Sequence, residues 1–550
     1  MKKAVPVIVA LSLIFLIILG VLGYQVIEKY MPTKDPADLF EVYGVNKGEA
    51  AIYYGYERLD DVIGICENGQ TYLPLSWVSQ NLNSKFYWDS AEKLLVYTLP
   101  DQIVYADAQT MGSNGAPLLL EKKDDVYLLL GLVANYTDTE FLEFDMDEVK
   151  RVLINPWGTR EVAEIKKGGY VRVKGGIKSP VLTRLEEGAE AILLEQMENW
   201  SKVVTEDGHI GYIENKMYQV KRTQVFESRR EPVVYKSTQL EEKIVLGWHQ
   251  VTNMAANGRL EDVVKGTRGL NVISPTWFAL TDNQGNFTSL ASKEYVDKAH
   301  AMGLQVWALL DNFSSSVQTE VLLSSTSTRR KLINNLVEEV EKYGIDGLNM
   351  DFESIKPEAG VHYIQFLREL SIPCREKGIV LSVDNYVPTS YNKFYEVEEQ
   401  GVVVDYVIIM GYDEHTKDSG PGSVASLDFV RSGIANTLEM VPKEKVINGV
   451  PFYTRIWTET GTELKCESYG ISAAKKWIAK NKVDLYWQAE LGQYYGEVQE
   501  ASGFSYVWME EENSLKLKMD LIKAYDLAGV ACWKLELEDE AAWDAISWEQ

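Results

Sequence analysis

The sequence predicts an α/β chain whose C-terminal part, residues 240–550, is a (β/α)8 TIM barrel. From residue 243 onward, apolar β-rich runs alternate with helical stretches. The runs are 244–247, 270–273, 304–310, 347–352, 379–383, 406–410, 446–450 and 530–535. Eight such alternations fit a closed parallel sheet with an outer ring of helices. The gap between 457 and 525 is too long for one helix, which predicts an inserted α+β subdomain before the eighth strand.

Length and composition limit the remaining possibilities. The chain has 550 residues, which at roughly 150 residues per domain predicts three or four domains. A net charge of −26 repels a phosphate backbone, so no nucleic acid is expected as a partner. The four cysteines and five histidines are scattered, without the spacing of metal ligands or of a disulfide framework. We therefore expect no metal and no cofactor, and we expect a monomer.

The first residues predict a membrane-spanning helix. Met1-Lys2-Lys3 precede the uncharged run 4–24, which as a helix spans roughly 31 Å, about one bilayer core. Because lysines favour the cytoplasmic side, residues 1–27 are predicted to be a signal anchor with 4–27 in the lipid bilayer. The bulk of this single-pass protein would then lie outside the cell membrane, in a bacterium of the Gram-positive type. A cleaved signal peptide and a buried helix of a soluble protein are the alternatives.

Two smaller domains are predicted between the anchor and the barrel, after a stalk over 28–45. Residues 46–157 contain a weak repeat, in which 71–78 recurs as 126–133, and this predicts two paired α+β units. Residues 165–222 contain short strands separated by glycines, at a spacing that predicts a small all-β barrel. The first domain resembles the N-terminal-like domain of copper amine oxidases, without a histidine for copper. The second resembles bacterial Src-homology-3-like domains.

The fourth apolar run carries the residues that suggest chemistry. It reads Asp346-Gly-Leu-Asn-Met-Asp-Phe-Glu353. Side chains alternate along a strand, so Asn349, Asp351 and Glu353 share one face, toward the barrel axis. Two carboxyls at the C-terminal end of a barrel strand are costly to bury, and this end is where such barrels do chemistry. We therefore expect a catalytic site there, whereas Asp346 lies on the other face and supports the start of the strand.

This run and several later motifs resemble glycoside hydrolase family 18, in the branch of bacterial spore-cortex and germination N-acetylglucosaminidases. The family hallmark D-x-x-D-x-D-x-E is matched except at Asn349. Further matches are Met410-Gly-Tyr-Asp413, Gly449-Val-Pro-Phe-Tyr453 with Arg455, Pro275-Thr-Trp-Phe278 and Trp533. The resemblance covers residues 243 to about 545. It implies a hydrolase of chitin-like or peptidoglycan chains, with an N-acetylated glycan polymer as its partner.

The resemblance also implies roles for single residues. Glu353 would protonate the glycosidic oxygen, Asp351 would hold the acetamido N–H of the substrate and raise the pKa of Glu353, and Tyr412 would bind the acetamido carbonyl. Substrate contacts are implied for Asp413, Met410, Trp533, Asn349, Trp277, Tyr453 and Arg455. For Trp277 a core position is an equal alternative. The Asn349 amide is expected to lower the pKa of Asp351 by donating a hydrogen bond to it.

Two functions remain open on these residues. The first is a membrane-anchored, extracytoplasmic hydrolase that cuts β-1,4 bonds next to N-acetylglucosamine. The second is a catalytically silent cell-wall protein that binds glycans on the same fold, which the two accessory domains and Asn349 would also fit. Glu353 favours the enzyme, because glycan-binding members of the family characteristically lose that acid.

Overall fold

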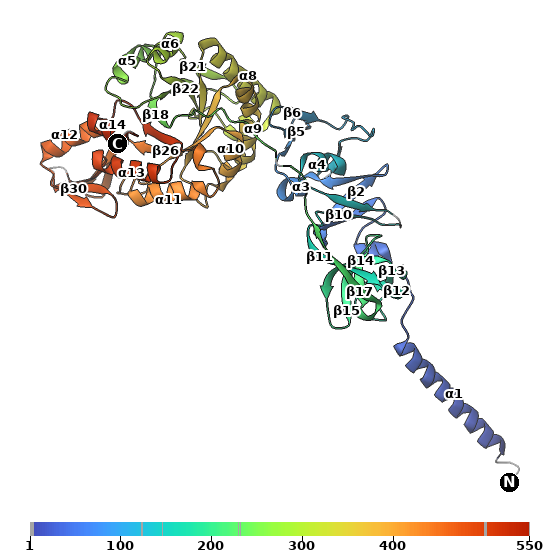
Figure 1. Cartoon of the computed structure of the whole chain (residues 1–550). Coiled ribbons are helices and arrows are strands. Elements are labelled where there is room, and N and C mark those ends of the chain that lie inside the picture. The colour runs from blue at the N-terminus through green and yellow to red at the C-terminus, as the bar shows by residue number, and fades with distance from the viewer. Residues whose placement is uncertain are drawn as a thin grey trace. The chain divides into compact units, whose positions relative to one another are not determined.

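The structure is a computed structural model that describes residues 5–122, 125–145, 147–228, 230–231, 233–499 and 503–548. The chain divides into two compact units. The first comprises Met1–Phe86 and Ala106–Pro232, and the second comprises Tyr87–Tyr105 and Val233–Gln550. The second unit thus includes a segment that the sequence analysis assigned to the repeat domain 46–157. Figure 1 labels many of the elements of both units.

The second unit contains a closed barrel of eight parallel strands, as predicted. Its strands are β18 (Ile244–His249), β19 (Val272–Pro275), β22 (Gln305–Asp311), β23 (Gly347–Asp351), β24 (Val380–Tyr386), β25 (Tyr406–Met410), β26 (Val446–Pro451) and β32 (Gly529–Trp533). They lie in the order β19-β18-β32-β26-β25-β24-β23-β22, and a pairing of β19 with β22 closes the barrel. The hairpin of β20 (Phe278–Leu280) and β21 (Phe287–Ser289) extends β22.

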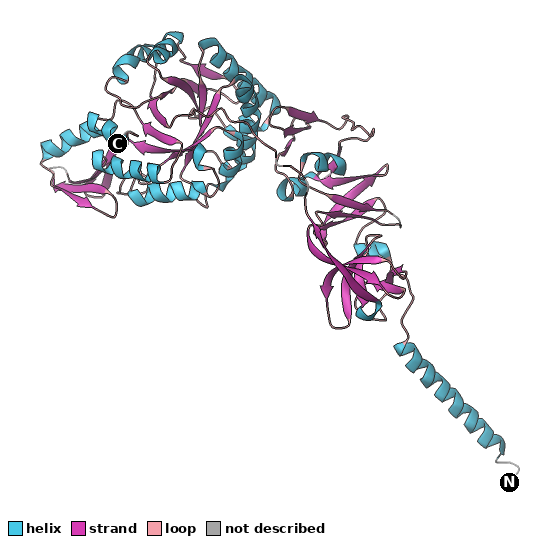
Figure 2. Ribbon diagram, viewed as in Figure 1, coloured by secondary structure: helices cyan, strands magenta, loops and turns pink. Residues whose placement is uncertain are grey.

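Helices cover the outside of this barrel (Figure 2). They are α5 (Leu260–Val263), α6 (Lys293–Ala301), α7 (Thr319–Ser324), α8 (Thr326–Tyr343), α9 (Gly360–Lys377), α10 (Val397–Val403), α11 (Leu427–Leu438), α13 (Glu512–Ala524) and α14 (Glu540–Ile546). Helix α8 shows why they form. The Ser325 side chain caps its first turn, Gly344 ends it in a left-handed conformation with φ 72°, and Leu332, Leu336 and Val340 form one buried stripe.

The inserted subdomain lies between β26 and α13. It contains a five-stranded sheet in the order β28-β27-β31-β30-β29. Its strands are β27 (Tyr453–Thr460), β28 (Glu463–Gly470), β29 (Leu485–Gln488), β30 (Gln493–Gln499) and β31 (Phe504–Met509), with helix α12 (Ile471–Asn481) after β28. The predicted α+β insertion is therefore present, and it begins a few residues earlier than expected, at Tyr453, just after the seventh barrel strand ends at Pro451.

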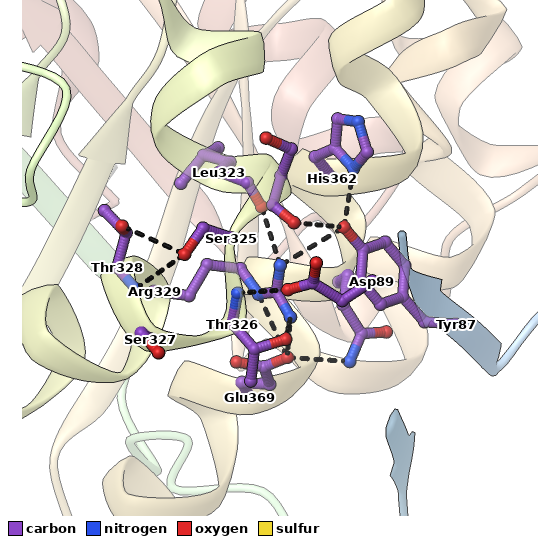
Figure 3. Close-up of polar contacts among 12 residues, drawn as sticks. Tyr87, Asp89, Leu323, Ser325, Thr326, Ser327, Thr328, Arg329, His362 and Glu369 are labelled. Carbon is purple, nitrogen blue, oxygen red and sulfur yellow. Dashed lines mark hydrogen bonds and ion pairs between the residues drawn. The ribbon is translucent and has the colours of Figure 1, made fainter. Parts of the chain in front are cut away.

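A small sheet of β4 (Phe86–Asp89), β5 (Leu94–Thr98) and β6 (Ile103–Ala106) packs on the barrel helices α8 and α9. Figure 3 shows the polar contacts. The Tyr87 hydroxyl lies 2.7 Å from His362 Nδ1, and Asp89 accepts the Thr326 N–H at 2.6 Å. Beneath them Arg329 and Glu369 form an ion pair at 2.8 Å with side chains 0% and 1% exposed. We call residues 87–105 the barrel strap.

The first unit contains two seven-stranded sheets. One has the order β7-β8-β3-β2-β1-β10-β9 and holds both copies of the repeat. Each copy folds as a strand followed by a short helix: β3 (Gln70–Pro74) with α3 (Leu75–Asn81), and β8 (Val126–Leu129) with α4 (Leu130–Tyr136). Its other strands are β1 (Glu49–Tyr54), β2 (Glu57–Glu67), β7 (Leu119–Glu121), β9 (Phe141–Phe144) and β10 (Lys150–Ile154), and α2 (Leu39–Tyr43) precedes β1. Strands β3 and β8 pair antiparallel, so the two copies share one sheet.

The other sheet is the predicted small β domain. It has the order β13-β12-β16-β15-β14-β11-β17. Its strands are β11 (Gly158–Ile165), β12 (Gly169–Arg172), β13 (Val181–Leu185), β14 (Glu190–Gln196), β15 (Trp200–Thr205), β16 (Ile210–Glu214) and β17 (Tyr218–Phe226). Ala163, Val171, Val203 and Ile213 lie in its core with no exposed surface.

Helix α1 (Val5–Tyr30) precedes both sheets. From Val7 to Tyr30 it is long and apolar enough to cross a membrane, and none of its most apolar stretch is buried in the protein. The same length, composition and position near the N-terminus also fit a signal sequence.

Candidate active site

A cavity of about 180 Å³ opens at the C-terminal ends of the barrel strands. It is lined by Trp248, Phe313, Asp351, Glu353, Asp384, Tyr386, Met410, Tyr412, Asp413 and Trp533. Six of these were expected from the sequence, namely Glu353, Asp351, Tyr412, Asp413, Met410 and Trp533. Residues from five different strands meet here because all parallel strands of a barrel end at the same face.

Glu353 follows the end of β23 and is partly buried. Its Oε2 accepts a hydrogen bond from the Tyr386 hydroxyl at 2.6 Å. Burial raises the pKa of Glu353, and the negative charges of Asp413 and Asp311 raise it further, whereas the bond from Tyr386 lowers it. The net effect is a raised pKa, which favours a protonated carboxyl that can act as a general acid.

Asp351 and Asp384 lie beside this acid and are 5% and 2% exposed. Burial and the nearby charges of Asp384, Glu353 and Asp311 raise the pKa of Asp351 well above its usual range. Burial also raises the pKa of Asp384 to about 8. Oδ1 of Asp351 is buried and has no hydrogen-bond partner among the residues that the structure describes. Asp351 lines the cavity, so its carboxyl group can accept a hydrogen bond from a bound ligand.

The position of Asn349 differs from the expectation. Its side chain has no exposed surface, so it cannot contact a substrate. Its Nδ2 donates to Asp384 Oδ1 at 2.9 Å and to Ser382 Oγ at 3.2 Å, and its Oδ1 accepts from Trp248 Nε1 at 2.9 Å. The amide thus bonds to Asp384 and not to Asp351, whose pKa is raised rather than lowered. The expected effect on Asp351 was wrong because the nearest acceptor lies across the sheet, on β24.

Tyr412 and Asp413 line one side of the cavity, and Tyr453 and Arg455 contact Asp413 from outside it. Burial raises the pKa of Tyr412, so its hydroxyl stays a neutral hydrogen-bond donor. Asp413 adopts a positive φ of 60° and accepts hydrogen bonds from the Tyr453 hydroxyl and from the Arg455 guanidinium. Tyr453 and Arg455 belong to β27, so the insertion holds Asp413 in place rather than lining the cavity itself.

The two tryptophans expected from the sequence have different positions. Trp533 lines the cavity, and its ring lies edge-on to that of Trp248 with centroids 5.7 Å apart. Trp277 is 1% exposed, donates its indole N–H to Asn257 Oδ1 at 2.9 Å and packs edge-on against Tyr295. Trp277 is therefore a core residue, which corrects its assignment to the substrate site.

Sequence analysis missed several residues of the site. They are Trp248, Asp311, Asn312, Phe313, Asp384 and Tyr386. Most of them directly follow or end the apolar runs of the third and fifth strands, in 311–313 and 384–386. Polar residues at the C-terminal ends of barrel strands are the available signal for such positions.

A second hollow of about 350 Å³ adjoins the cavity and shares Phe313 and Glu353 with it. Its other lining residues are Asn312, Val317, Gln318, Thr319, Glu320, Ser354, Ile355 and Lys356. The Phe313 side chain is 57% exposed. Glu353 lines both hollows. Among the residues that the structure describes, no cluster of three His, Cys, Asp or Glu side chains suits a metal ion.

Comparison with known families gives two matches. The sequence model of "Glycosyl hydrolases family 18" matches residues 210–538, and that of the bacterial SH3 domain matches residues 167–218. The resemblance of residues 46–157 to the copper amine oxidase domain stays a prediction.

Similar proteins come mainly from Bacillus. The chain is 26% identical over 291 residues to "Uncharacterized glycosylase YvbX" of Bacillus subtilis, covering 50% of this chain and 84% of that protein. It is 29% identical over 245 residues to "Cortical fragment-lytic enzyme" of Bacillus anthracis, covering 42% and 56%. The chain thus spans little more than half the length of the second relative.

Solved structures share the fold. The spore cortex-lytic enzyme SleL of Bacillus cereus has a TM-score of 0.51 at 20% identity, covering 60% of this chain and 77% of that one. A chitinase of Chromobacterium violaceum has a TM-score of 0.51 at 22% identity, covering 56% and 98%.

Proposed function

Since the chain belongs to glycoside hydrolase family 18, we propose that it hydrolyses β-1,4 bonds next to N-acetylglucosamine in peptidoglycan, spore cortex or a chitin-like glycan. The observation that carries this proposal is the Asp351 carboxyl in the cavity wall beside Glu353, whose Oδ1 has no hydrogen-bond partner within the described part of the chain. A buried carboxyl oxygen without a donor is costly unless a ligand supplies one. The N–H of a 2-acetamido group is a donor of the required kind.

The reaction would be substrate-assisted and retaining, as in the exception that this family makes among glycosidases. Glu353 donates its proton to the glycosidic oxygen as that bond breaks, while the acetamido oxygen attacks the anomeric carbon. Asp351 accepts the acetamido N–H and stabilises the resulting oxazolinium cation. Water then attacks the anomeric carbon, gives its proton to Glu353 and reopens the ring. In this mechanism Tyr412 donates a hydrogen bond to the acetamido oxygen, and Trp533 packs against the sugar.

The site of action is proposed to be outside the cytoplasmic membrane. Helix α1 provides a candidate anchor, the bacterial SH3 match suggests a wall-associated protein, and the relatives include cortical fragment-lytic enzymes. We propose a retained single-pass anchor with the amino terminus in the cytoplasm.

The test uses the full chain in detergent, with N-acetylchitohexaose and purified peptidoglycan as substrates and product masses as the readout. We expect wild type to release fragments with new reducing ends and to be inhibited by a thiazoline analogue of the oxazoline. Glu353→Gln should lose activity by on the order of 10²–10⁴-fold. Glu358→Gln, an exposed glutamate five positions on, is the matched control and should keep wild-type activity.

Full activity in Glu353→Gln would remove the proposed mechanism. Binding of peptidoglycan without any hydrolysis, by wild type and variant alike, would instead support the silent glycan-binding protein.

A further inference from the structure

The segment that carries Glu353 lies beyond the sheet. Strand β23 ends at Asp351, and Ser354, directly after the acid, has a positive φ of 51°. Such a conformation is uncommon for a residue other than glycine. The backbone hydrogen bonds of the strand therefore no longer fix the acid, and other groups must hold it in position.

Asn312 holds the backbone of Glu353 from the β22 side. Its Oδ1 accepts the Glu353 N–H at 3.0 Å, and its Nδ2 donates to the Glu353 carbonyl at 3.0 Å. The same Nδ2 donates to Thr319 Oγ1 at 3.0 Å, at the start of α7. The side-chain amide thus replaces a peptide group of the neighbouring strand and continues the β22–β23 ladder past its last pair, Asp311 with Asp351.

Tyr386 holds the acid from the β24 side. Its hydroxyl donates to Glu353 Oε2 at 2.6 Å and accepts the Ser354 N–H at 3.3 Å. Burial and the neighbouring Glu353 raise the pKa of Tyr386, so the hydroxyl keeps its proton and remains a donor. Its ring lies at 90° to that of Tyr395, whose hydroxyl donates to the Phe352 carbonyl at 3.3 Å.

We propose that Asn312 and Tyr386 are positioning residues that together clamp the general acid: Asn312 fixes the backbone of Glu353, and Tyr386 occupies Oε2 so that Oε1 faces the scissile oxygen. This inference rests on the proposed function, because it needs Glu353 to be the proton donor. The physical reason is that proton transfer requires a hydrogen-bond distance to the reacting oxygen, and a displacement of about 1 Å costs on the order of 10²-fold in rate.

The clamp also predicts how the acid titrates. The titratable groups that interact with Glu353 are Asp311 on β22, Asp351 on β23, Asp384 and Tyr386 on β24, Tyr395 before α10, and Tyr412 and Asp413 after β25. Of these groups, only the Tyr386 hydroxyl lowers the pKa of Glu353, because it donates a hydrogen bond to the carboxylate. Removing that hydroxyl should raise the pKa of Glu353 and move the alkaline limb of the kcat profile to higher pH.

The experiment measures kcat, KM and the pH profile of the full chain in detergent on N-acetylchitohexaose, with purified peptidoglycan as second substrate. We expect Asn312→Ala to lower kcat about 10- to 100-fold with KM within about twofold. Tyr386→Phe should lower kcat and move the alkaline limb of the kcat–pH profile to higher pH, by at least about half a pH unit. Thr319→Val, which removes the brace of Asn312, should lower kcat by less than Asn312→Ala does.

Two matched controls remove similar bonds elsewhere in the barrel. Asn392→Ala deletes an amide that accepts the Thr389 N–H and donates to the Val387 carbonyl, and Tyr406→Phe deletes a buried hydroxyl bonded to the Leu240 N–H. Both should keep the wild-type pH profile. If Asn312→Ala does not fold, Asn312→Asp serves, because it keeps the acceptor for the Glu353 N–H and loses the donor to its carbonyl.

The outcomes separate the two proposals. One possible result is that Asn312→Ala and Tyr386→Phe keep the wild-type kcat and the wild-type alkaline limb of the pH profile, while Glu353→Gln is inactive. This result would overturn the clamp and leave the proposed function intact. The clamp would also be overturned if Asn312→Ala and Tyr386→Phe lost no more kcat than the two control variants do. Activity in Glu353→Gln would overturn the proposed function, and the clamp with it.

Discussion

The Nδ2 atom of Asn349 lies 2.9 Å from Oδ1 of Asp384, on the neighbouring strand β24. The family hallmark usually has a carboxyl at position 349, whereas this chain has an amide there that faces the carboxyl of Asp384. Both side chains are buried, and the hydrogen bond that the amide donates allows them to pack side by side. An amide facing a carboxyl forms a hydrogen bond, whereas two carboxyls at this distance need a shared proton.

This relationship predicts the effect of Asn349→Asp. A second carboxyl against Asp384 must share a buried proton with it, so we expect Asn349→Asp to destabilise the protein at pH 7 by about 1–3 kcal/mol. The pH profile of hydrolysis should move as well. The exchange variant Asn349→Asp with Asp384→Asn restores one amide and one carboxyl and should recover most of the stability. Equal unfolding midpoints for wild type and Asn349→Asp would contradict the prediction.

Asp384 predicts a pH dependence of stability. Its pKa is raised to about 8 in the folded protein, whereas an unfolded aspartate titrates near pH 3.9. Between these two pKa values the folded protein keeps a proton that the unfolded chain releases. The contribution of Asp384 to the stability of the folded state is therefore largest below about pH 4 and is lost as pH rises toward 8. The thermal midpoint of the barrel should therefore fall between pH 5 and pH 8. In Asp384→Asn the thermal midpoint should fall less over this pH range. If it falls as steeply as in wild type, Asp384 is not the cause of the decline.

The buried pair Arg329–Glu369 predicts a large cost for breaking it. Glu369→Gln leaves the guanidinium buried without its counter-charge, which should lower the free energy of unfolding by about 3–5 kcal/mol. Lys516→Met breaks an exposed ion pair with Asp520 at 2.9 Å and is the control, with an expected change below about 1 kcal/mol. Denaturant unfolding of the full chain measures the change in unfolding free energy for each variant. If both changes are small and similar, the Arg329–Glu369 pair does not stabilise the barrel.

The barrel strap predicts that residues 240–550 are not an independent fragment. Without residues 87–105, the Thr326 N–H loses the Asp89 carboxylate and the pair beneath Tyr87 loses its cover. We expect this fragment to unfold at a lower temperature than the barrel in the full chain. Asp89→Asn in the full chain should cause a smaller shift in the same direction. A fragment as stable as the full-length barrel would contradict a structural role for the strap.

The N-terminal helix predicts how the protein fractionates. With a retained anchor, the intact mass should include residues 1–27 and the protein should stay in the membrane pellet after carbonate extraction. External protease should remove the bulk of the chain from intact protoplasts. A mature chain that begins after the apolar run, found in the medium, would identify a cleaved signal peptide.

Several features followed directly from the sequence because they depend on local patterns. Alternation along the strand predicted that Asp351 and Glu353 face the same way, and both line the cavity, although Glu353 lies past the end of β23 and is held there by residues of other strands. Eight apolar runs separated by helical stretches predicted the barrel, since this alternation has few other packing solutions. Asn312 and Tyr386 were not predicted, because each acts on Glu353 from another strand and nothing in its own neighbourhood indicates that contact.

The repeat illustrates the limit most clearly. Each copy encodes a strand and a helix followed by a hairpin, and this local structure follows from the pattern of its own residues. Contacts with distant residues make β9 and β10 join the repeat sheet, whereas β4 and β5 pack on the barrel helices. Hydrophobic periodicity predicts which face of a hairpin is buried. It does not predict the surface on which that face packs, because that surface is selected by contacts between residues far apart in the chain, such as the contact of Tyr87 with His362.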